Sequence, residues 1–510
     1  MGRNKQLLIN MTAQIVAFVV NFAINFFLTP FILDNVGREA YGFVSLGNNF
    51  VNYASLASAA LNSMAGRFIS IRIQKKDFEN AKKYYTSVFV ANIVIAVAVS
   101  VPAILVVIFL DRIVNIRESL VRDVQILWSG LFINFIVGLI AAAFGALLFA
   151  ANRIDVQSKR NAESYVIKAV ILWGMFSLFI PKVWYIGLAT LICGLYAMFM
   201  DMHYARKFYP DIRFDLKYFD FGKIKELLAS GIWNTVSRVG SLVLTELDLL
   251  LSNWLVGSAA MGTLSIAKTV PNYASNFTGT IVTVFMPQLT ISYATDSKEK
   301  FIREIRKCMK ILLFFNSVIF GILFGFTDVF LELWLPDSTT DVGFIYILSV
   351  LTILGGFVSS VIQVMFNIFT VTNKLRFSSI TILLTGVVSI VLTVAFVKGT
   401  NLGLLAIAGV SVICVIIRNI FIILPYGAKC IDMPWYTFFP DLFLNIFDVG
   451  VSAAIGILLK TILMRTVTWG TLIGAAIVAV AAIMIFNYFI ILKREERKFL
   501  LDKLKSKLKR

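Results

Sequence analysis

The sequence predicts an all-α integral membrane protein with about fourteen transmembrane helices, arranged as two pseudo-symmetric six-helix lobes and two further C-terminal helices. Three observations lead to this fold class. The 510 residues are 59% hydrophobic and only 15% charged, which is far too apolar for a soluble protein. About fourteen apolar stretches can each cross about 30 Å of hydrocarbon, and none shows the alternation of a membrane β-strand. A segment of the first half also recurs in the second half.

Each apolar stretch predicts one helix. Their centres lie near residues 20, 54, 97, 136, 172, 193, 241, 274, 321, 356, 387, 413, 450 and 480. The first, from Leu7 to Leu33, is too long and too polar for the core of a signal peptide, so we expect it to remain as a helix. With the N-terminus in the cytosol, most of the 47 lysines and arginines fall in cytosolic segments. We therefore expect a multi-pass protein of the cell (plasma) membrane with both termini cytosolic, and no nucleic-acid binding despite the net charge of +18.

The recurring segment defines an internal repeat. Residues 36–55, VGREAYGFVSLGNNFVNYAS, and residues 256–275, VGSAAMGTLSIAKTVPNYAS, share nine identical positions at an offset of 220. Six predicted spans separate the copies, so both have the same orientation and should be related by an axis along the membrane normal. The predicted organisation is an N-lobe (1–202), a cytosolic linker (203–224), a C-lobe (225–426), two additional helices (427–492) and a basic cytosolic tail (493–510).

A polar stripe runs along the seventh stretch, from Ala229 to Leu255. At steps of three and four it carries Asn234, Arg238, Ser241, Thr245, Asp248 and Ser252. These steps keep the six side chains within roughly 80° of one helix face. A charged residue in mid-membrane costs about 2.5 to 3.5 kcal/mol, so such a face usually meets other helices or a water-filled path. Arg238 has no acidic neighbour within one turn, and we expect its counter-charge to come from another helix or from a ligand.

Three other stretches carry candidate lining residues. They are Gln14, Asn21 and Asn25 on the first, Ser45, Asn48, Asn52, Ser55 and Asn62 on the second, and Ser265, Lys268, Asn272 and Ser275 on the eighth. At the offset of 220, Gln14 falls on Asn234 and Asn21 on Ser241, so the polar face of the first helix recurs on the seventh. Interhelical hydrogen bonding without a cavity is the alternative interpretation. In the eighth stretch Pro271 deprives the carbonyl of Ala267 of its usual helical partner.

Further ionisable residues form a second group of candidates. Asp248 and Glu246 could bind a proton or a cation for coupling, or pair with a basic residue. The second-rank site residues are Arg67, Lys168, Arg418 and Asp448. For Lys168 and Arg418 we favour snorkelling towards lipid head groups, and Asp448 lies near the middle of the thirteenth stretch.

The sequence lacks the motifs of several chemistries. It contains no G-x-x-x-x-G-K-[ST], no H-E-x-x-H and no soluble domain, so we expect neither ATP hydrolysis nor a metal or other cofactor. Its cysteines at 193, 308, 414 and 430 predict no disulfide framework. An integral-membrane glycosyltransferase or polymerase is the rival enzyme class, but it would need a larger loop with clustered carboxylates.

Two runs carry a resemblance to a known family, LDNVGREAYGFVSL at 33–46 and DLLLSNWLVGSAAMGTLSIA at 248–267. With the two-lobe pattern, they make the whole chain resemble the Wzx-type polysaccharide flippases of the multidrug/oligosaccharidyl-lipid/polysaccharide exporter (MOP) superfamily. The resemblance implies transport rather than catalysis. The implied reaction moves a polyprenyl-diphosphate-linked oligosaccharide, the repeat unit of a cell-surface polysaccharide, from the cytosolic to the outer leaflet by alternating access.

The candidate residues suit such a substrate. A diphosphate needs cations, which Arg238 and Lys268 supply, and sugar hydroxyls need neutral hydrogen-bonding groups. The expected partners are an undecaprenyl-diphosphate-type lipid-linked oligosaccharide, anionic lipids at the tail, and polysaccharide polymerase machinery. The alternative is a cation-coupled multidrug or toxin extruder of the same superfamily, using Asp248 and Glu246. Fourteen spans favour the lipid-linked substrate, because the resemblance implies twelve for multidrug extruders.

Overall fold

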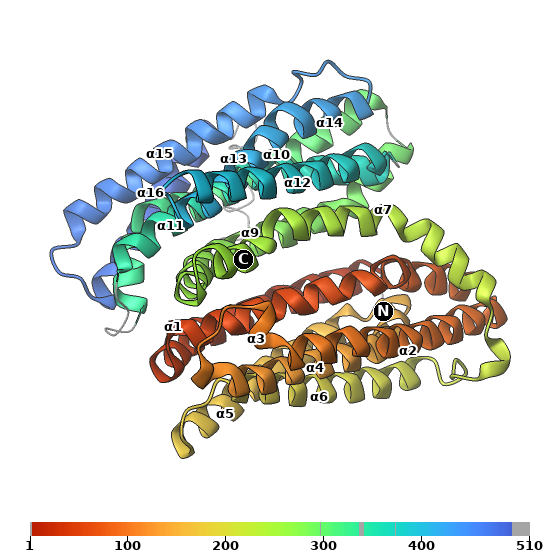
Figure 1. The fold of residues 1–510 in the computed structure, drawn as a ribbon. Helices are drawn as coiled ribbons and strands as arrows, with labels where there is room; N and C mark the ends of the chain where they lie inside the picture. The colour runs from red at the N-terminus through yellow and green to blue at the C-terminus, as the bar shows by residue number, and fades with distance from the viewer. Residues whose placement is uncertain (1–2, 296, 336–340, 373, 492–510) are drawn as a thin grey trace, which may run out of the picture. The chain divides into compact units, whose positions relative to one another are not determined.

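The computed structural model describes residues 3–295, 297–335, 341–372 and 374–491, and all its regular elements there are helical (Figure 1). They are α1 (Arg3–Gln74), α2 (Phe78–Ile108), α3 (Leu110–Ile113), α4 (Glu118–Ala150), α5 (Ile154–Leu178), α6 (Trp184–Phe208), η1 (Leu216–Tyr218), α7 (Phe221–Thr245), α8 (Leu247–Leu255), α9 (Ser258–Thr295), α10 (Lys298–Trp334), α11 (Val342–Val371), α12 (Leu375–Gly399), α13 (Leu404–Arg418), η2 (Asn419–Ile423), α14 (Leu424–Cys430), α15 (Phe439–Leu463) and α16 (Trp469–Ile490). The all-α prediction is confirmed. The basic tail at 493–510 lies outside the described residues.

Ten helices in the described part of the chain are long and apolar enough to cross a membrane. One of them, α1, contains the first two predicted spans, which meet at Gly37 with a φ of 79°. The spans predicted near residues 172, 241 and 274 lie in α5, α7 and α9, which are not among the ten. Every predicted centre falls in a helix, so the apolar stretches located the helices correctly.

The helix boundaries reproduce the internal repeat. α2 begins at Phe78 and α10 at Lys298, while α6 begins at Trp184 and α13 at Leu404, an offset of 220 in both cases. The repeat also preserves backbone conformation, because Gly37 and its equivalent Gly257 both have positive φ values, of 79° and 131°. A positive φ favours glycine, which explains why this residue is identical in the two copies.

Repeat-equivalent residues touch each other in the structure. The hydroxyl of Ser265 donates to that of its equivalent Ser45 at 2.5 Å. A Cβ atom on Gly42 would lie 2.8 Å from the Cα of its equivalent, Gly262. When a residue contacts its own counterpart, the two copies meet next to a two-fold axis. This supports the predicted pseudo-symmetry, and the small residues let the two backbones approach closely.

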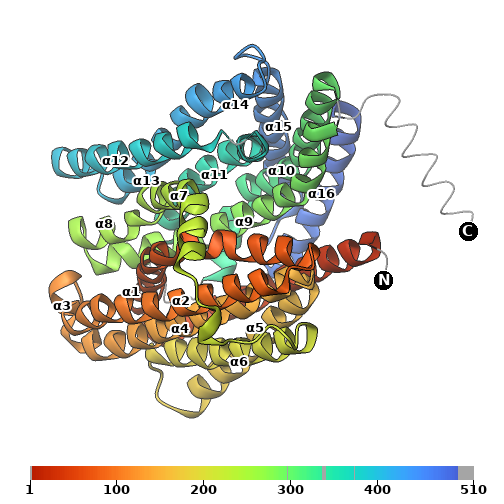
Figure 2. The ribbon, with the colours of Figure 1, turned by 90° about the vertical axis from the view of Figure 1, so that its right-hand side faces the viewer.

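The packing divides the chain into two compact units. The first contains Met1–Ile266 and Ser379–Ile407, and the second contains Ala267–Ser378 and Ala408–Arg510. In the first unit α1 packs against α2, α4, α5 and α7, and α4 packs against α6 (Figures 1 and 2). In the second unit α10 packs against α11, α15 and α16. These units differ from the lobes predicted at 1–202 and 225–426, whose boundaries follow the repeat and stay a prediction.

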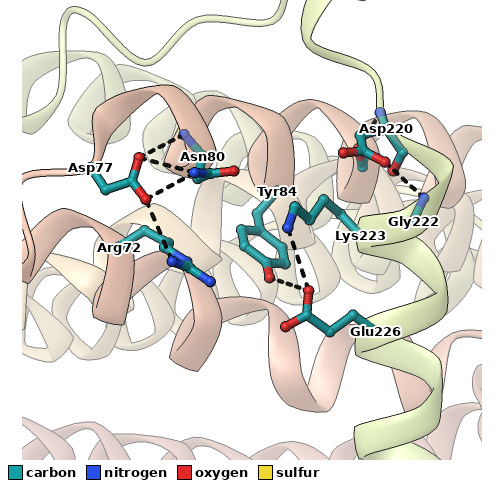
Figure 3. A network of polar contacts seen from close by, with 9 residues as sticks. Arg72, Asp77, Asn80, Tyr84, Asp220, Gly222, Lys223 and Glu226 are labelled. Atoms are coloured by element: carbon teal, nitrogen blue, oxygen red, sulfur yellow. Dashed lines mark hydrogen bonds and ion pairs between the residues drawn. The ribbon is translucent and has the colours of Figure 1, made fainter.

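Polar contacts join the start of α7 to α2 within the first unit (Figure 3). The Ser87 hydroxyl donates to the carbonyl of Asp220 at 3.1 Å and accepts from the N–H of the same residue at 3.0 Å. The hydroxyl of Tyr84 donates to the carboxylate of Glu226, and the Lys223 ammonium lies 5.0 Å from the centre of the Tyr84 ring. The linker between the predicted lobes therefore ends in a polar cluster that anchors α7.

The Gly42–Gly262 contact can be tested by adding one methyl group. We expect Gly42→Ala to destabilise the protein by about 1 to 3 kcal/mol, because the added atom meets backbone that cannot move aside. Gly138→Ala is the matched control, since a Cβ atom at Gly138 meets nothing within 4 Å. Thermal unfolding of the purified protein in detergent measures both, and equal midpoints for the two variants would contradict the close approach.

Candidate functional site

The candidate site is centred on a break in the predicted seventh span. α7 ends at Thr245 and α8 begins at Leu247, with Glu246 between them at φ −113° and ψ −18°. Two side chains of α1 donate to the Glu246 carbonyl, Asn49 through its amide at 2.7 Å and Tyr53 through its hydroxyl at 2.9 Å. The amide of Asn52 donates to the Glu246 carboxylate at 2.9 Å. Interrupted backbone is tolerated in a membrane only where protein or water satisfies it, and here α1 does so.

The partner of Arg238 differs from the prediction. Its guanidinium lies 3.7 Å from the carboxylate of Glu246, which belongs to the same segment eight residues later. The expectation of a counter-charge from another helix or a ligand is therefore corrected. Eight residues span about 12 Å of helix, which is more than two turns. Two long side chains can nevertheless cover this distance.

This ion pair leaves much of Arg238 available. The side chain is 45% exposed, whereas that of Glu246 is 20% exposed. A distance of 3.7 Å exceeds hydrogen-bond length, and a guanidinium has five N–H donors. The geometry therefore holds Arg238 near Glu246 without enclosing it.

The polar stripe changes character at the break. Before it, Arg238 and Thr245 are exposed, and the Thr245 hydroxyl donates to the Ser241 carbonyl at 2.8 Å. Asn234 and Ser241 are half-buried. After the break Asp248 is buried, with its carboxylate accepting from the N–H of Leu249 at 2.8 Å. The predicted stripe therefore crosses an interruption of the helix at Glu246, and its residues differ in burial on the two sides.

The predicted residues of α1 have different environments. Gln14 and Asn21 are half-buried, and Asn21 accepts a hydrogen bond from Asn25 at its carbonyl at 2.9 Å. Asn48 is exposed and donates to the Val44 carbonyl of its own helix at 2.9 Å. Only Asn52 joins Arg238, through their shared contact with Glu246. The sequence reasoning missed Asn49 and Tyr53, although Tyr53 is identical to its repeat equivalent.

In α9 the helical hydrogen bond that Pro271 removes is replaced by a bond from another helix. Pro271 frees the carbonyl of Ala267, which accepts a hydrogen bond from the buried Ser349 hydroxyl at 3.0 Å. Lys268 is half-buried and Asn272 is exposed. Both belong to the second unit and Arg238 to the first, so the joint action of Arg238 and Lys268 stays a prediction.

The four second-rank residues differ in how deeply they are buried. Arg67 is exposed and Lys168 is half-buried. Arg418 is only 7% exposed and donates to the side-chain oxygen of Asn419 at 2.8 Å, so the snorkelling interpretation is wrong for this residue. It directly precedes the π-helical turn η2, an irregularity common at functional sites. Asp448 is fully buried in α15.

Substitutions in α1 can test whether its side chains stabilise the backbone at Glu246. Changing Asn49→Ala together with Tyr53→Phe removes both side-chain donors to the Glu246 carbonyl. We expect a loss of about 1 to 3 kcal/mol, since a buried acceptor loses its partners, and faster hydrogen exchange at residues 246–250. Asn48→Ala is the matched control, because Asn48 bonds only within its own helix. The interpretation fails if all variants melt and exchange alike.

Comparisons with known proteins agree with this fold. A family model described as "Polysaccharide biosynthesis protein" matches residues 5–292. The "Uncharacterized membrane protein EpsK" of Bacillus subtilis is 28% identical over 504 residues, covering 98% of each chain.

Solved structures of transporters show the same fold. The lipid II flippase MurJ, in its inward closed conformation, has a TM-score of 0.66 at 14% identity and covers 94% of this chain and 98% of its own. An inward-facing MATE-family multidrug resistance transporter of the MOP superfamily also has a TM-score of 0.66, at 15% identity, covering 83% of this chain and 98% of its own. A MOP superfamily transporter from Pyrococcus furiosus has a TM-score of 0.61 at 15% identity, covering 84% of this chain and 98% of its own.

These structures show which fold the chain has. Their identities are too low to transfer a substrate, but they agree with the prediction of an all-α membrane protein. The family model, by contrast, covers more than half of the 510 residues. The chain therefore belongs to the polysaccharide biosynthesis protein family, in keeping with its resemblance to the Wzx-type flippases.

Proposed function

We propose that this protein flips a polyprenyl-diphosphate-linked oligosaccharide, the repeat unit of a cell-surface polysaccharide, from the cytosolic to the outer leaflet. The observation that carries the proposal is the partly exposed Arg238 beside a helix break lined with asparagines. Membership of the polysaccharide biosynthesis family supports the substrate class, and the fold shared with the lipid II flippase supports the mode of transport.

Arg238 and Lys268 hold the diphosphate in this proposal. A guanidinium can bind two phosphate oxygens at once, whereas an ammonium acts as a point charge. When the diphosphate arrives, it replaces Glu246 as the main partner of Arg238. The neutral residues Asn234, Ser241, Thr245, Asn272, Asn48, Gln14 and Asn21 then serve the sugar hydroxyls.

Substitutions at Arg238 and Glu246 separate substrate binding from a structural ion pair. We expect Arg238→Ala to lower transport by about tenfold or more, since hydrogen bonds to charged groups contribute about 1.5 to 3 kcal/mol, and Arg238→Lys to impair it partly. Lys268→Ala should also lower transport. Flipping of a fluorescent polyprenyl-diphosphate sugar in proteoliposomes measures each effect, with Arg465→Ala as the control for loss of an exposed charge.

The double variant Arg238→Ala with Glu246→Gln decides between the two roles. If Arg238 binds the diphosphate, the double variant folds but still fails to transport. If Arg238 only balances Glu246, neutralising both residues restores transport, and the diphosphate role is refuted.

Transport proceeds by alternating access, with the lobes moving about the repeat axis. Opening on the outer side must then separate the repeat equivalents Ser45 and Ser265, whose hydroxyls are 2.5 Å apart. A cysteine pair at the cytosolic ends of the same two helices should trap the opposite state.

A reversible cross-link tests this motion. We expect Ser45→Cys with Ser265→Cys to form a disulfide that blocks transport, and a reductant to restore it. The two single-cysteine variants are the controls, and the four native cysteines are buried, which limits side reactions. Full transport by the cross-linked protein would exclude separation of these helices.

A further inference from the structure

A second polar cluster lies inside the bundle of α10, α15 and α16, all within the second unit. On α15, Asn445, Asp448 and Ser452 follow each other at steps of three and four, which places them on one face of the helix. Each of the three is at most 1% exposed. Ser317 of α10 and Asn487 of α16 are both fully buried. Such groups are rare in the interior of an apolar bundle and call for a physical explanation.

The helices around this cluster are in close contact. The Asn487 amide donates to the Ser317 hydroxyl at 2.5 Å, which joins α16 to α10. A Cβ atom on Gly321 of α10 would lie 2.6 Å from the Cβ of Ser452, which joins α10 to α15. α10 and α15 therefore approach each other closely beside Ser452.

Several oxygen atoms of the cluster have no hydrogen-bond partner among the described residues. They are both carboxylate oxygens of Asp448, the side-chain oxygens of Asn445 and Asn487, and the hydroxyl of Ser452. The amide nitrogen of Asn445 has no partner either. The Ser317 hydroxyl lies within hydrogen-bonding reach of the Asp448 carboxylate and also donates to the Phe314 carbonyl at 3.0 Å, so it offers Asp448 at most a shared proton. A buried polar group without a partner is costly. An amide and a hydroxyl carry no charge, so they cannot balance the charge of the Asp448 carboxylate, and the cluster lacks a cation.

No counter-charge for Asp448 comes from the helices packed against it. α11 and α16 contain no charged residue, and α10 has none between Lys310 and Asp328. Lys310 precedes Ser317 by seven residues, about 10 Å along the axis.

The other charged residues of α15 are engaged elsewhere. Asp441 pairs with Arg306 at 3.7 Å, and Lys460 pairs with Asp328 at 2.6 Å. An isolated carboxylate in such surroundings costs several kcal/mol unless a positive charge neutralises it. Asp448 therefore needs that charge from outside the chain described here.

We propose that Asp448, with the oxygens of Asn445, Ser452 and Asn487, forms a binding site for one small monovalent cation, either a proton on the carboxyl group or Na⁺ among the oxygens. One carboxylate matches one positive charge, and carboxylate, amide and hydroxyl oxygens are the ligands of hard cations. The site lies on the two helices outside the repeat, away from Arg238 in the sequence. It does not depend on the identity of the transported substrate.

Thermal unfolding and direct binding test the site without any transport assay. The full chain in lipid nanodiscs would be melted between about pH 5 and about pH 9, in NaCl or in choline chloride of equal ionic strength. In choline, the wild type should lose stability as the pH rises, because ionisation leaves a bare buried carboxylate. If Na⁺ binds, it should raise the midpoint by about 3 °C or more at high pH, with little effect at low pH.

Asp448→Asn is the decisive variant, because the amide keeps the side-chain volume and resembles the neutralised carboxyl group. It should lose both responses and bind ²²Na⁺ at least about tenfold more weakly. Asp111→Asn is the control, because it removes an exposed carboxylate of the first unit, and it should keep both responses. Ser452→Ala, which removes one oxygen, should weaken the Na⁺ response alone and remains informative if Asp448→Asn does not fold.

The two cations give distinct results. A pH response without a Na⁺ response identifies a proton, and a Na⁺ response that Asp448→Asn removes identifies Na⁺. The proposal is overturned if the wild type and Asp448→Asn share the same dependence on pH and Na⁺.

Discussion

Polar groups inside this protein need partners other than lipid, because hydrocarbon supplies no hydrogen bonds. This constraint explains two of the places where a helix gives up its regular bonding. At the α7–α8 break, Asn49 and Tyr53 bond the Glu246 carbonyl. Next to Pro271, Ser349 bonds the carbonyl of Ala267. Both compensations come from a neighbouring helix, so the irregular backbone and the packing depend on each other.

The same constraint separates structural polar groups from candidate binding groups. Serines and asparagines such as Ser45, Asn49 and Ser349 have partners that join helices, and a ligand is not needed to explain them. Arg238 has an acidic partner but remains accessible, a balance that suits a residue which exchanges partners during transport. Asp448 is fully buried, and no charged residue of the described helices packed against it balances its carboxylate, which suits a bound cation.

The internal repeat relates the two halves of the candidate site region to each other. Equivalent residues meet at the Ser45–Ser265 and Gly42–Gly262 contacts, so the two copies share an interface made from the same sequence. α15 and α16 have no equivalents in the repeat, and they carry the most deeply buried carboxylate. In this arrangement, the proposed substrate contacts lie in the repeated part of the chain and the proposed cation site involves the added part.

The sequence alone determined the helical class, the positions of the helices and the repeat, because apolar length and an offset of 220 can be read along a chain. It also identified Arg238, Asn52, Glu246 and Asp448 as unusual, since polar residues in apolar stretches need a reason. Only the tertiary structure decided how these residues are used. The Glu246 break, the Arg238 ion pair and the isolation of Asp448 depend on side-chain reach and on contacts between distant segments, which helical periodicity does not contain.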